Sequence, residues 1–297
     1  MGGVRPYLKA VWRLTRAEHG LMYAVGVVVG AVLGGARVSD AQVVLSGCIT
    51  AIMLEAGTFA LNDYYDFEVD RKNNRLDRPL VTGEIGLNEA FIMGWTLIAA
   101  GMLFALFLPI PCLLLAFIAA VLGVLYDIKL KETGPGGNLY ISLTMALPFV
   151  FGGLLVKPEP DLILLVLASI AFLIGFGREV MKGIVDIEGD AIRDVSTIAR
   201  RWGVKRAKQI SALFYLIGIT ISPIPFLINL NPSYFMNIAY LVPLVFADLI
   251  LLHVTFRLPS EDREGVDRLR SVSLIALLSG LIAFLAGAMI QLPLGGV

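Results

Sequence analysis

Long apolar segments alternate with short polar connections along nearly the whole chain. A helix needs roughly 20 mainly apolar residues to cross a hydrocarbon core of about 30 Å. Nine segments meet this requirement: 20–37, 41–63, 88–108, 110–127, 138–156, 161–184, 207–229, 234–256 and 271–292. The pattern therefore predicts an all-α multi-pass membrane protein with nine transmembrane helices.

Composition and charge agree with this class. Of the 297 residues, 57% are hydrophobic and 16% are charged, whereas soluble domains average about 45–50% apolar and about 25% charged residues. The formal net charge is zero, which argues against a basic surface for nucleic acid. Segment 5–18 has an apolar and a basic side, which predicts an interfacial amphipathic helix before the first span.

The positions of the cations predict the orientation. If the N-terminus is cytoplasmic, every Lys and Arg except Arg37 and Lys157 falls on the cytoplasmic side of the nine spans. Cytoplasmic loops of membrane proteins carry such an excess. We therefore expect a protein of the cell membrane with its N-terminus in the cytoplasm and its C-terminus outside.

Two acidic clusters lie at the cytoplasmic ends of helices four spans apart. Asn62, Asp66 and Asp70 follow one another at four-residue spacing, and Asp186 and Asp190 repeat that spacing. Carboxylates stacked on one helical face repel each other, and hard oxygen ligands suit Mg²⁺. A solvated acidic helix end explains either cluster alone, but two clusters favour halves that meet around a multivalent cation.

This duplication predicts how the chain is organised. We interpret 1–297 as a single intramembrane domain with two similar four-helix halves, about 20–130 and 138–256, and a ninth helix at 271–292.

Cations accompany the carboxylates at the same membrane face. Lys131, Lys182, Arg178 and Arg75 are placed there by the topology. Aspartate-bound Mg²⁺ surrounded by Lys and Arg can bind and neutralise a diphosphate leaving group. A site at the hydrocarbon boundary further indicates that the rest of the substrate is a lipid tail. Asp127, at a helix end, is most simply solvated or paired with a lysine.

Four motifs in order resemble the UbiA superfamily of intramembrane prenyltransferases. Its NDxxDxxxD signature matches 62–70, and its DxxxD signature matches 186–190. The LDRPLVTG stretch at 76–83 and the LYDIKLKETGPGGN stretch at 125–138 are similar to further family motifs. The resemblance covers nearly the whole chain.

The resemblance implies a fold and a reaction. Nine helices would surround a central cavity, and the connections at 64–87 and 185–206 would cap it on the cytoplasmic side. The reaction would be metal-assisted loss of diphosphate from an allylic prenyl donor, followed by attack of a lipid-soluble acceptor. Two Mg²⁺ ions are implied. The expected partners are the two substrates and the membrane lipids, and no obligatory protein partner is expected.

The resemblance also implies roles for individual residues. Asn62, Asp66 and Asp70 would hold one Mg²⁺, and Asp186 and Asp190 the other. Lys131 and Lys182 would contact the diphosphate, and Tyr126 would lie near the reacting carbon.

The acceptor is less closely defined. Segment 178–190 resembles archaeal members that attach a geranylgeranyl group to geranylgeranylglyceryl phosphate, although Gly183 stands where an acidic residue is common. Aromatic prenylation, with 4-hydroxybenzoate or a quinone or chlorophyll-type acceptor, is the alternative. A membrane transporter is a more remote alternative. Its carboxylates would be expected near the bilayer midplane, whereas those of this chain cluster at one surface.

Four residues are candidates for binding the acceptor. A second cationic site for its phosphate would come from Arg16, His19 or Arg78. Glu55 precedes Asn62 by seven residues on nearly the same helical face, about 10.5 Å deeper. It would orient the acceptor or act as its base, and a carboxyl hydrogen-bonded between helices is the simpler explanation.

Overall fold

The computed structural model describes residues 4–188 and 195–290, and all regular secondary structure in these ranges is helical. The expected all-α class is therefore confirmed. The α-helices are α1 (Val4–Thr15), α2 (Ala17–Leu33), α3 (Ala41–Lys72), α4 (Leu87–Ala105), α5 (Ile110–Ile128), α6 (Pro135–Leu154), α7 (Leu162–Val185), α9 (Ile198–Trp202), α10 (Val204–Ile221), α11 (Ile224–Leu227), α12 (Ile238–Arg257) and α13 (Arg263–Met289). Short 3₁₀ helices are η1 (Val38–Asp40), η2 (Leu130–Thr133) and η3 (Leu258–Ser260).

Eight helices in the described ranges are long and apolar enough to cross a membrane. The amphipathic α1 and the apolar α2 form a bent pair with an angle of 56°, which makes up to nine spans. The bend falls at Arg16, whose φ of 44° is uncommon for a residue with a side chain.

Two helices extend beyond the predicted spans. Helix α3 continues to Lys72 rather than ending at 63, and α13 begins at Arg263 rather than at 271. The apolar pattern locates only the part of a helix in hydrocarbon, whereas backbone hydrogen bonding extends these helices into the polar layer. The predicted span 207–229 is confirmed as a span at Val204–Leu227. Within it the helix breaks at Pro223, between α10 and α11, because proline lacks the amide that continues a helix.

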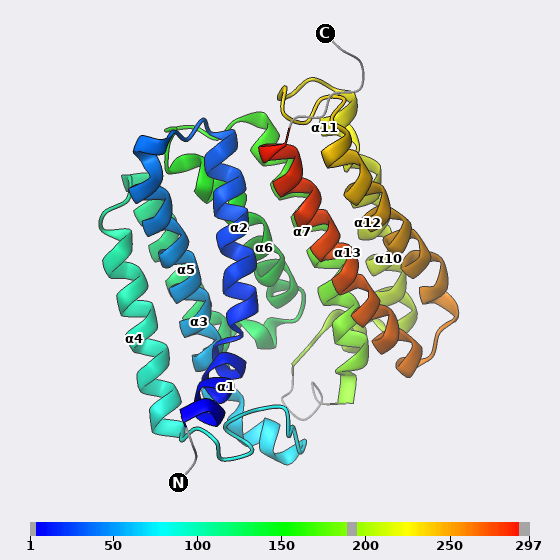
Figure 1. Ribbon diagram of the computed structural model, residues 1–297. Helices are drawn as coiled ribbons and strands as arrows, with labels where there is room; N and C mark the ends of the chain where they lie inside the picture. The colour runs from blue at the N-terminus through cyan, green and yellow to red at the C-terminus, as the bar shows by residue number, and fades with distance from the viewer. Residues whose placement is uncertain (1–3, 189–194, 291–297) are drawn as a thin grey trace.

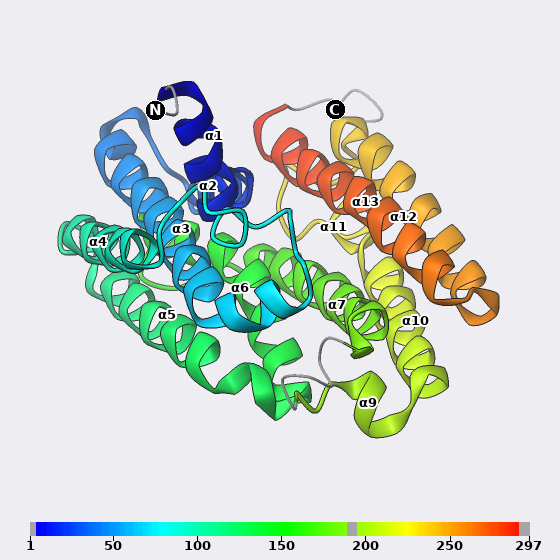
Figure 2. The same ribbon diagram turned by 90° about the horizontal axis from the view of Figure 1, so that it is seen from below.

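The spanning helices pack into two groups that lie side by side (Figures 1 and 2). Helices α2 to α6 form one group and α7 to α13 the other, and they meet mainly where α6 packs on α7 and α2 packs on α13. Helices α2 and α6 cross at glycines, because a Cβ at Gly30 would lie 2.1 Å from the Phe149 carbonyl oxygen and one at Gly152 would lie 2.1 Å from the Val27 carbonyl oxygen. That the two halves share one fold stays a prediction.

One end of the molecule gathers the polar connections. The α3–α4 connection, the α5–α6 connection and the α12–α13 turn all lie at the lower end of Figure 1, together with α1. Helix α13 ends at the opposite, upper end. The described carboxylates predicted to act together therefore come from segments at the same end.

Candidate active site

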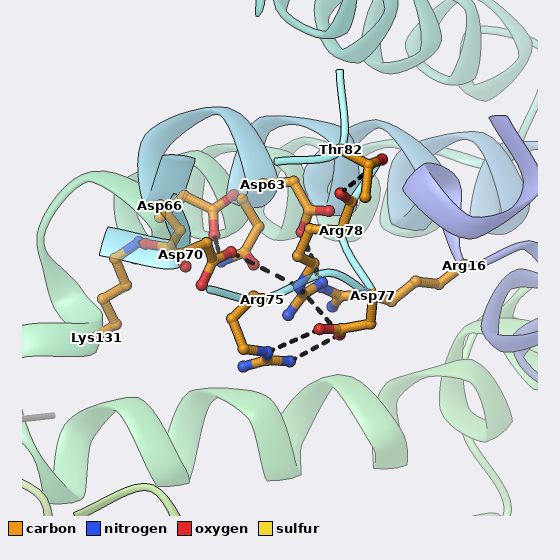
Figure 3. A network of polar contacts seen from close by, with 11 residues as sticks. Arg16, Asp63, Asp66, Asp70, Arg75, Asp77, Arg78, Thr82 and Lys131 are labelled. Atoms are coloured by element: carbon orange, nitrogen blue, oxygen red, sulfur yellow. Dashed lines mark hydrogen bonds and ion pairs between the residues drawn. The ribbon is translucent and has the colours of Figure 1, made fainter. Parts of the chain in front are cut away.

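The extension of α3 beyond the apolar segment carries three buried aspartates. Asp63, Asp66 and Asp70 are only 1%, 7% and 2% exposed. They are separated by three and four residues, so they share one face of the helix. Buried carboxylates need partners, and Figure 3 shows cations from several other segments turned toward them.

Asp63 joins three parts of the chain. Its Oδ1 accepts a hydrogen bond from Arg16 at 2.9 Å and another from Arg78 at 2.8 Å. Arg16 stands at the α1–α2 bend, and Arg78 lies in the α3–α4 connection, with its Nε 3.6 Å from Oδ2 of Asp70. Arg16 and Arg78 were predicted to meet an acceptor phosphate, and such a phosphate must compete with this carboxylate. The remaining candidate, His19, has a side chain that is 46% exposed and lies edge-on to Phe59, with ring centroids 5.4 Å apart.

Lys131 forms an ion pair with Asp66. It belongs to η2. Gly134, three residues further on, has a φ of 73°. A Cβ at Gly134 would lie 1.8 Å from the Ser196 carbonyl oxygen, and the Ser196 amide donates to the Glu132 carbonyl at 3.3 Å. The α5–α6 connection is thus bound to the segment after α7, which fixes where Lys131 reaches.

Asn62 is held by Asp127, whose side chain is buried. The Asn62 amide nitrogen donates to Oδ1 of Asp127 at 2.9 Å, and Asp127 is 3% exposed. The prediction that Asp127 is solvated or lysine-paired was wrong. Its side chain points from the last turn of α5 toward α3 and is buried there. Because the amide nitrogen is directed at Asp127, the Asn62 oxygen can face a cation.

The second predicted cluster lies at the end of α7. Asp186 is the half-buried C-terminal cap of that helix, whereas Asp190 lies outside the described residues.

Arg75 donates to Asp77 through Nε and Nη2, both at 2.9 Å. These bonds lower the pKa of the Asp77 carboxyl to about 2.

Sequence reasoning missed Glu179. This residue is 7% exposed, and its carboxylate lies 3.4 Å from the Lys182 Nζ and 3.6 Å from an Arg178 guanidinium nitrogen. Both cations are predicted to meet the diphosphate, and in this structure both lie beside Glu179. The three-residue spacing of Glu179 and Lys182 was the only signal, and it is common on helices.

Tyr126 connects the polar end with a cavity between the helices. Its ring stacks on Tyr140 with centroids 5.0 Å apart and an angle of 27° between the ring planes. Tyr140 is one wall of a cavity among α2, α3, α5 and α6. The lining is largely apolar and includes Glu55.

The donor chemistry fits Mg²⁺. Asn62, Asp66 and Asp70 offer amide and carboxylate oxygens from one helix, which is the ligand type that Mg²⁺ prefers. Within 4–188 and 195–290, no three carboxylate, imidazole or thiol groups converge into an assembled metal site. Asp66 pairs with Lys131, and Asp70 lies near Arg78.

Comparison with known proteins identifies the class. The UbiA prenyltransferase family matches residues 23–278, so the chain belongs to this family of integral membrane prenyltransferases. The expectation from the four motifs is confirmed.

Several relatives are similar over nearly their whole length. The chain is 45% identical to the digeranylgeranylglyceryl phosphate synthase of Archaeoglobus fulgidus over 97% of this chain and 98% of the relative. It is 32% identical to the synthase of the same name from Methanopyrus kandleri, over 94% and 99%.

Solved structures share the fold. A structure reported for digeranylgeranylglyceryl phosphate synthase in membranes superposes with a TM-score of 0.73 and 25% identity, covering 95% of this chain and 99% of that one. A UbiA homologue from Archaeoglobus fulgidus bound to DMAPP and Mg²⁺ superposes with a TM-score of 0.68 and 21% identity, covering 94% and 99%.

Proposed function

We propose that this protein transfers a geranylgeranyl group from geranylgeranyl diphosphate to the free hydroxyl of geranylgeranylglyceryl phosphate, with Mg²⁺ as its cofactor. The observation that carries the proposal is the near full-length similarity, at 45% identity, to a digeranylgeranylglyceryl phosphate synthase. The product is an archaeal ether lipid, and the second product is diphosphate.

The buried donors support a metal site at the end of α3. Asn62, Asp66 and Asp70 hold one Mg²⁺ in this proposal, and Asp186 and Asp190 hold a second. Bound Mg²⁺ supplies charge that stabilises the diphosphate as it leaves. Relatives of this fold have been solved with Mg²⁺ and with DMAPP or GPP, which agrees with this assignment.

The cations around the cluster suit the anionic part of the donor. Lys131, Lys182, Arg178 and Arg75 bind the diphosphate in this proposal, after exchanging their present carboxylate partners for it. In this proposal the Tyr126 ring faces the allylic carbon, where positive charge develops. The excess of Lys and Arg at this end supports a cytoplasmic active site and N-terminus.

The test is transfer by the purified protein in detergent. Labelled geranylgeranyl diphosphate and Mg²⁺ are supplied with either geranylgeranylglyceryl phosphate or 4-hydroxybenzoate. We expect an ether product with the first acceptor and loss of activity when the metal is chelated. Product with 4-hydroxybenzoate alone would assign aromatic prenylation instead.

Variants locate the metal site. Asp66→Ala and Asp190→Ala should each remove most activity. Asp161→Ala is the matched control, because this carboxylate precedes α7 at the opposite end and pairs with Lys157 at 2.5 Å. Normal turnover in both site variants refutes the metal assignment, and absence of diphosphate release from the native protein refutes the function.

A further inference from the structure

A carboxyl side chain lies in the membrane-spanning part of α3 and faces a cavity. Glu55 is half-buried and lines the cavity between α2, α3, α5 and α6. An ionisable group at this depth is costly, and such groups in membrane proteins usually serve a function. The proposed metal and diphosphate site does not use it.

The polar neighbours of Glu55 form a small hydroxyl-rich patch in an otherwise apolar cavity. Tyr23, Tyr140 and Thr144 line the same space, and the Tyr23 hydroxyl donates to Thr144 at 3.0 Å. The Arg16 guanidinium is bound to Asp63. Glu55 therefore shares its cavity with hydroxyl groups, which are suited to binding another hydroxyl.

The position of Glu55 fits a proton acceptor for the transfer. Glu55 lies seven residues before Asn62 in α3, which is about 10.5 Å along the axis. Two helical turns therefore separate Glu55 from the first proposed metal ligand, on nearly the same face of α3. Tyr140, which lines the cavity together with Glu55, stacks on Tyr126.

We propose that Glu55 is the general base that takes the proton from the acceptor hydroxyl, and that the cavity beside it holds that hydroxyl and part of the hydrocarbon. This inference rests on the proposed function. The acceptor oxygen forms a bond to the allylic carbon, whose bond to the diphosphate oxygen breaks. The bonding electron pair leaves with the diphosphate, and the proton passes to the Glu55 carboxylate.

The test compares two nucleophiles that differ in their need for a base. One is geranylgeranylglyceryl phosphate, and the other is the same lipid with a thiol in place of the hydroxyl. A thiol has a pKa near 8.5 and loses its proton without help. In Glu55→Gln, we expect transfer to the alcohol to fall by about 100-fold or more. Transfer to the thiol should fall far less, and Mg²⁺-dependent binding of the donor should match the native protein.

The control is Asp248→Asn. Asp248 is a second carboxylate in a membrane-spanning helix, α12, where it accepts a hydrogen bond from Ser222 at 2.7 Å, and it lies away from the cavity. This variant should transfer to both nucleophiles at the native rates.

The outcomes separate the two proposals. If the native protein forms no ether product, the proposed function fails. If the native protein forms it and Glu55→Gln is equally fast, only the assignment of the base fails. Equal losses with alcohol and thiol assign Glu55 a purely structural role and overturn the inference as well.

Discussion

Replacement of Asp63 by asparagine should destabilise the protein strongly, although the side chain keeps its shape. Asp63 is 1% exposed and binds Arg16 at 2.9 Å and Arg78 at 2.8 Å. Asparagine cannot neutralise either guanidinium. The change therefore leaves two positive charges close together and poorly solvated.

The magnitude follows from the burial of the partners. Removal of one member of a buried ion pair costs about 3–5 kcal/mol. The side chains of Arg16 and Arg78 are 21% and 19% exposed, so water compensates part of the loss and the lower limit of about 3 kcal/mol applies. For a chain of this size, about 2 °C is lost per kcal/mol, which predicts a fall in Tm of roughly 6 °C.

The assay is thermal unfolding in detergent, followed by tryptophan fluorescence. Glu84→Gln is the control, because Glu84 pairs with Arg13 where both side chains are exposed by more than a third. Such a pair contributes less than about 1 kcal/mol. Combining Asp63→Asn with Arg16→Gln should recover part of the lost stability, since one unpaired charge is removed. A Tm for Asp63→Asn within about 1 °C of the native value would refute the reasoning.

Three further predictions concern the segments around the cluster. Gly134→Ala should lower activity far more than Gly83→Ala, because the two glycines have φ of 73° and 74° but only the first Cβ would meet another atom; equal activity losses would contradict this. Asp77→Asn should lower Tm by a constant amount above about pH 4, since the native pKa near 2 lies below the unfolded value. This difference should vanish as the pH falls through 2, and a difference that persists there would exclude the ion pair as its source. Lys131→Met should raise the affinity for Mg²⁺ in the absence of donor by about tenfold, because a positive charge beside Asp66 is removed, and it should weaken donor binding. Titration calorimetry measures both affinities. A loss of both would argue against competition between lysine and metal.

The helices were predictable because membrane spans need long apolar segments, and their ends were not. Residues 64–72 are mostly polar or charged, yet α3 continues through them. Burial of Asp66 and Asp70 there depends on Lys131 and Arg78, which come from other connections. The apolar pattern of one segment carries no information about contacts with other segments, so it does not predict this stabilisation.

The candidate site was predictable in its donors and not in their present partners. The four-residue spacing indicates that Asn62, Asp66 and Asp70 share a face, and this is what α3 shows. Nothing in that spacing indicates that Asp127 holds the Asn62 amide or that Glu179 lies beside Lys182 and Arg178. The first contact depends on how α3 and α5 pack together, and the second is a local contact within α7 of a kind common on helices.

The cations of the site compensate the charge of the buried aspartates and, under the proposed function, also bind the diphosphate. Buried carboxylates are unfavourable without compensating charge, so Arg16, Arg78 and Lys131 stabilise the α3 aspartates in the absence of a ligand. Under the proposed function, Asp66 and Asp70 would hold Mg²⁺, whose charge would compensate theirs, and Lys131 would bind the diphosphate. Asp63 is excluded from the proposed metal ligands and keeps its two arginines. Its ion pairs can therefore hold α1, α3 and the α3–α4 connection together throughout the exchange of charges beside it.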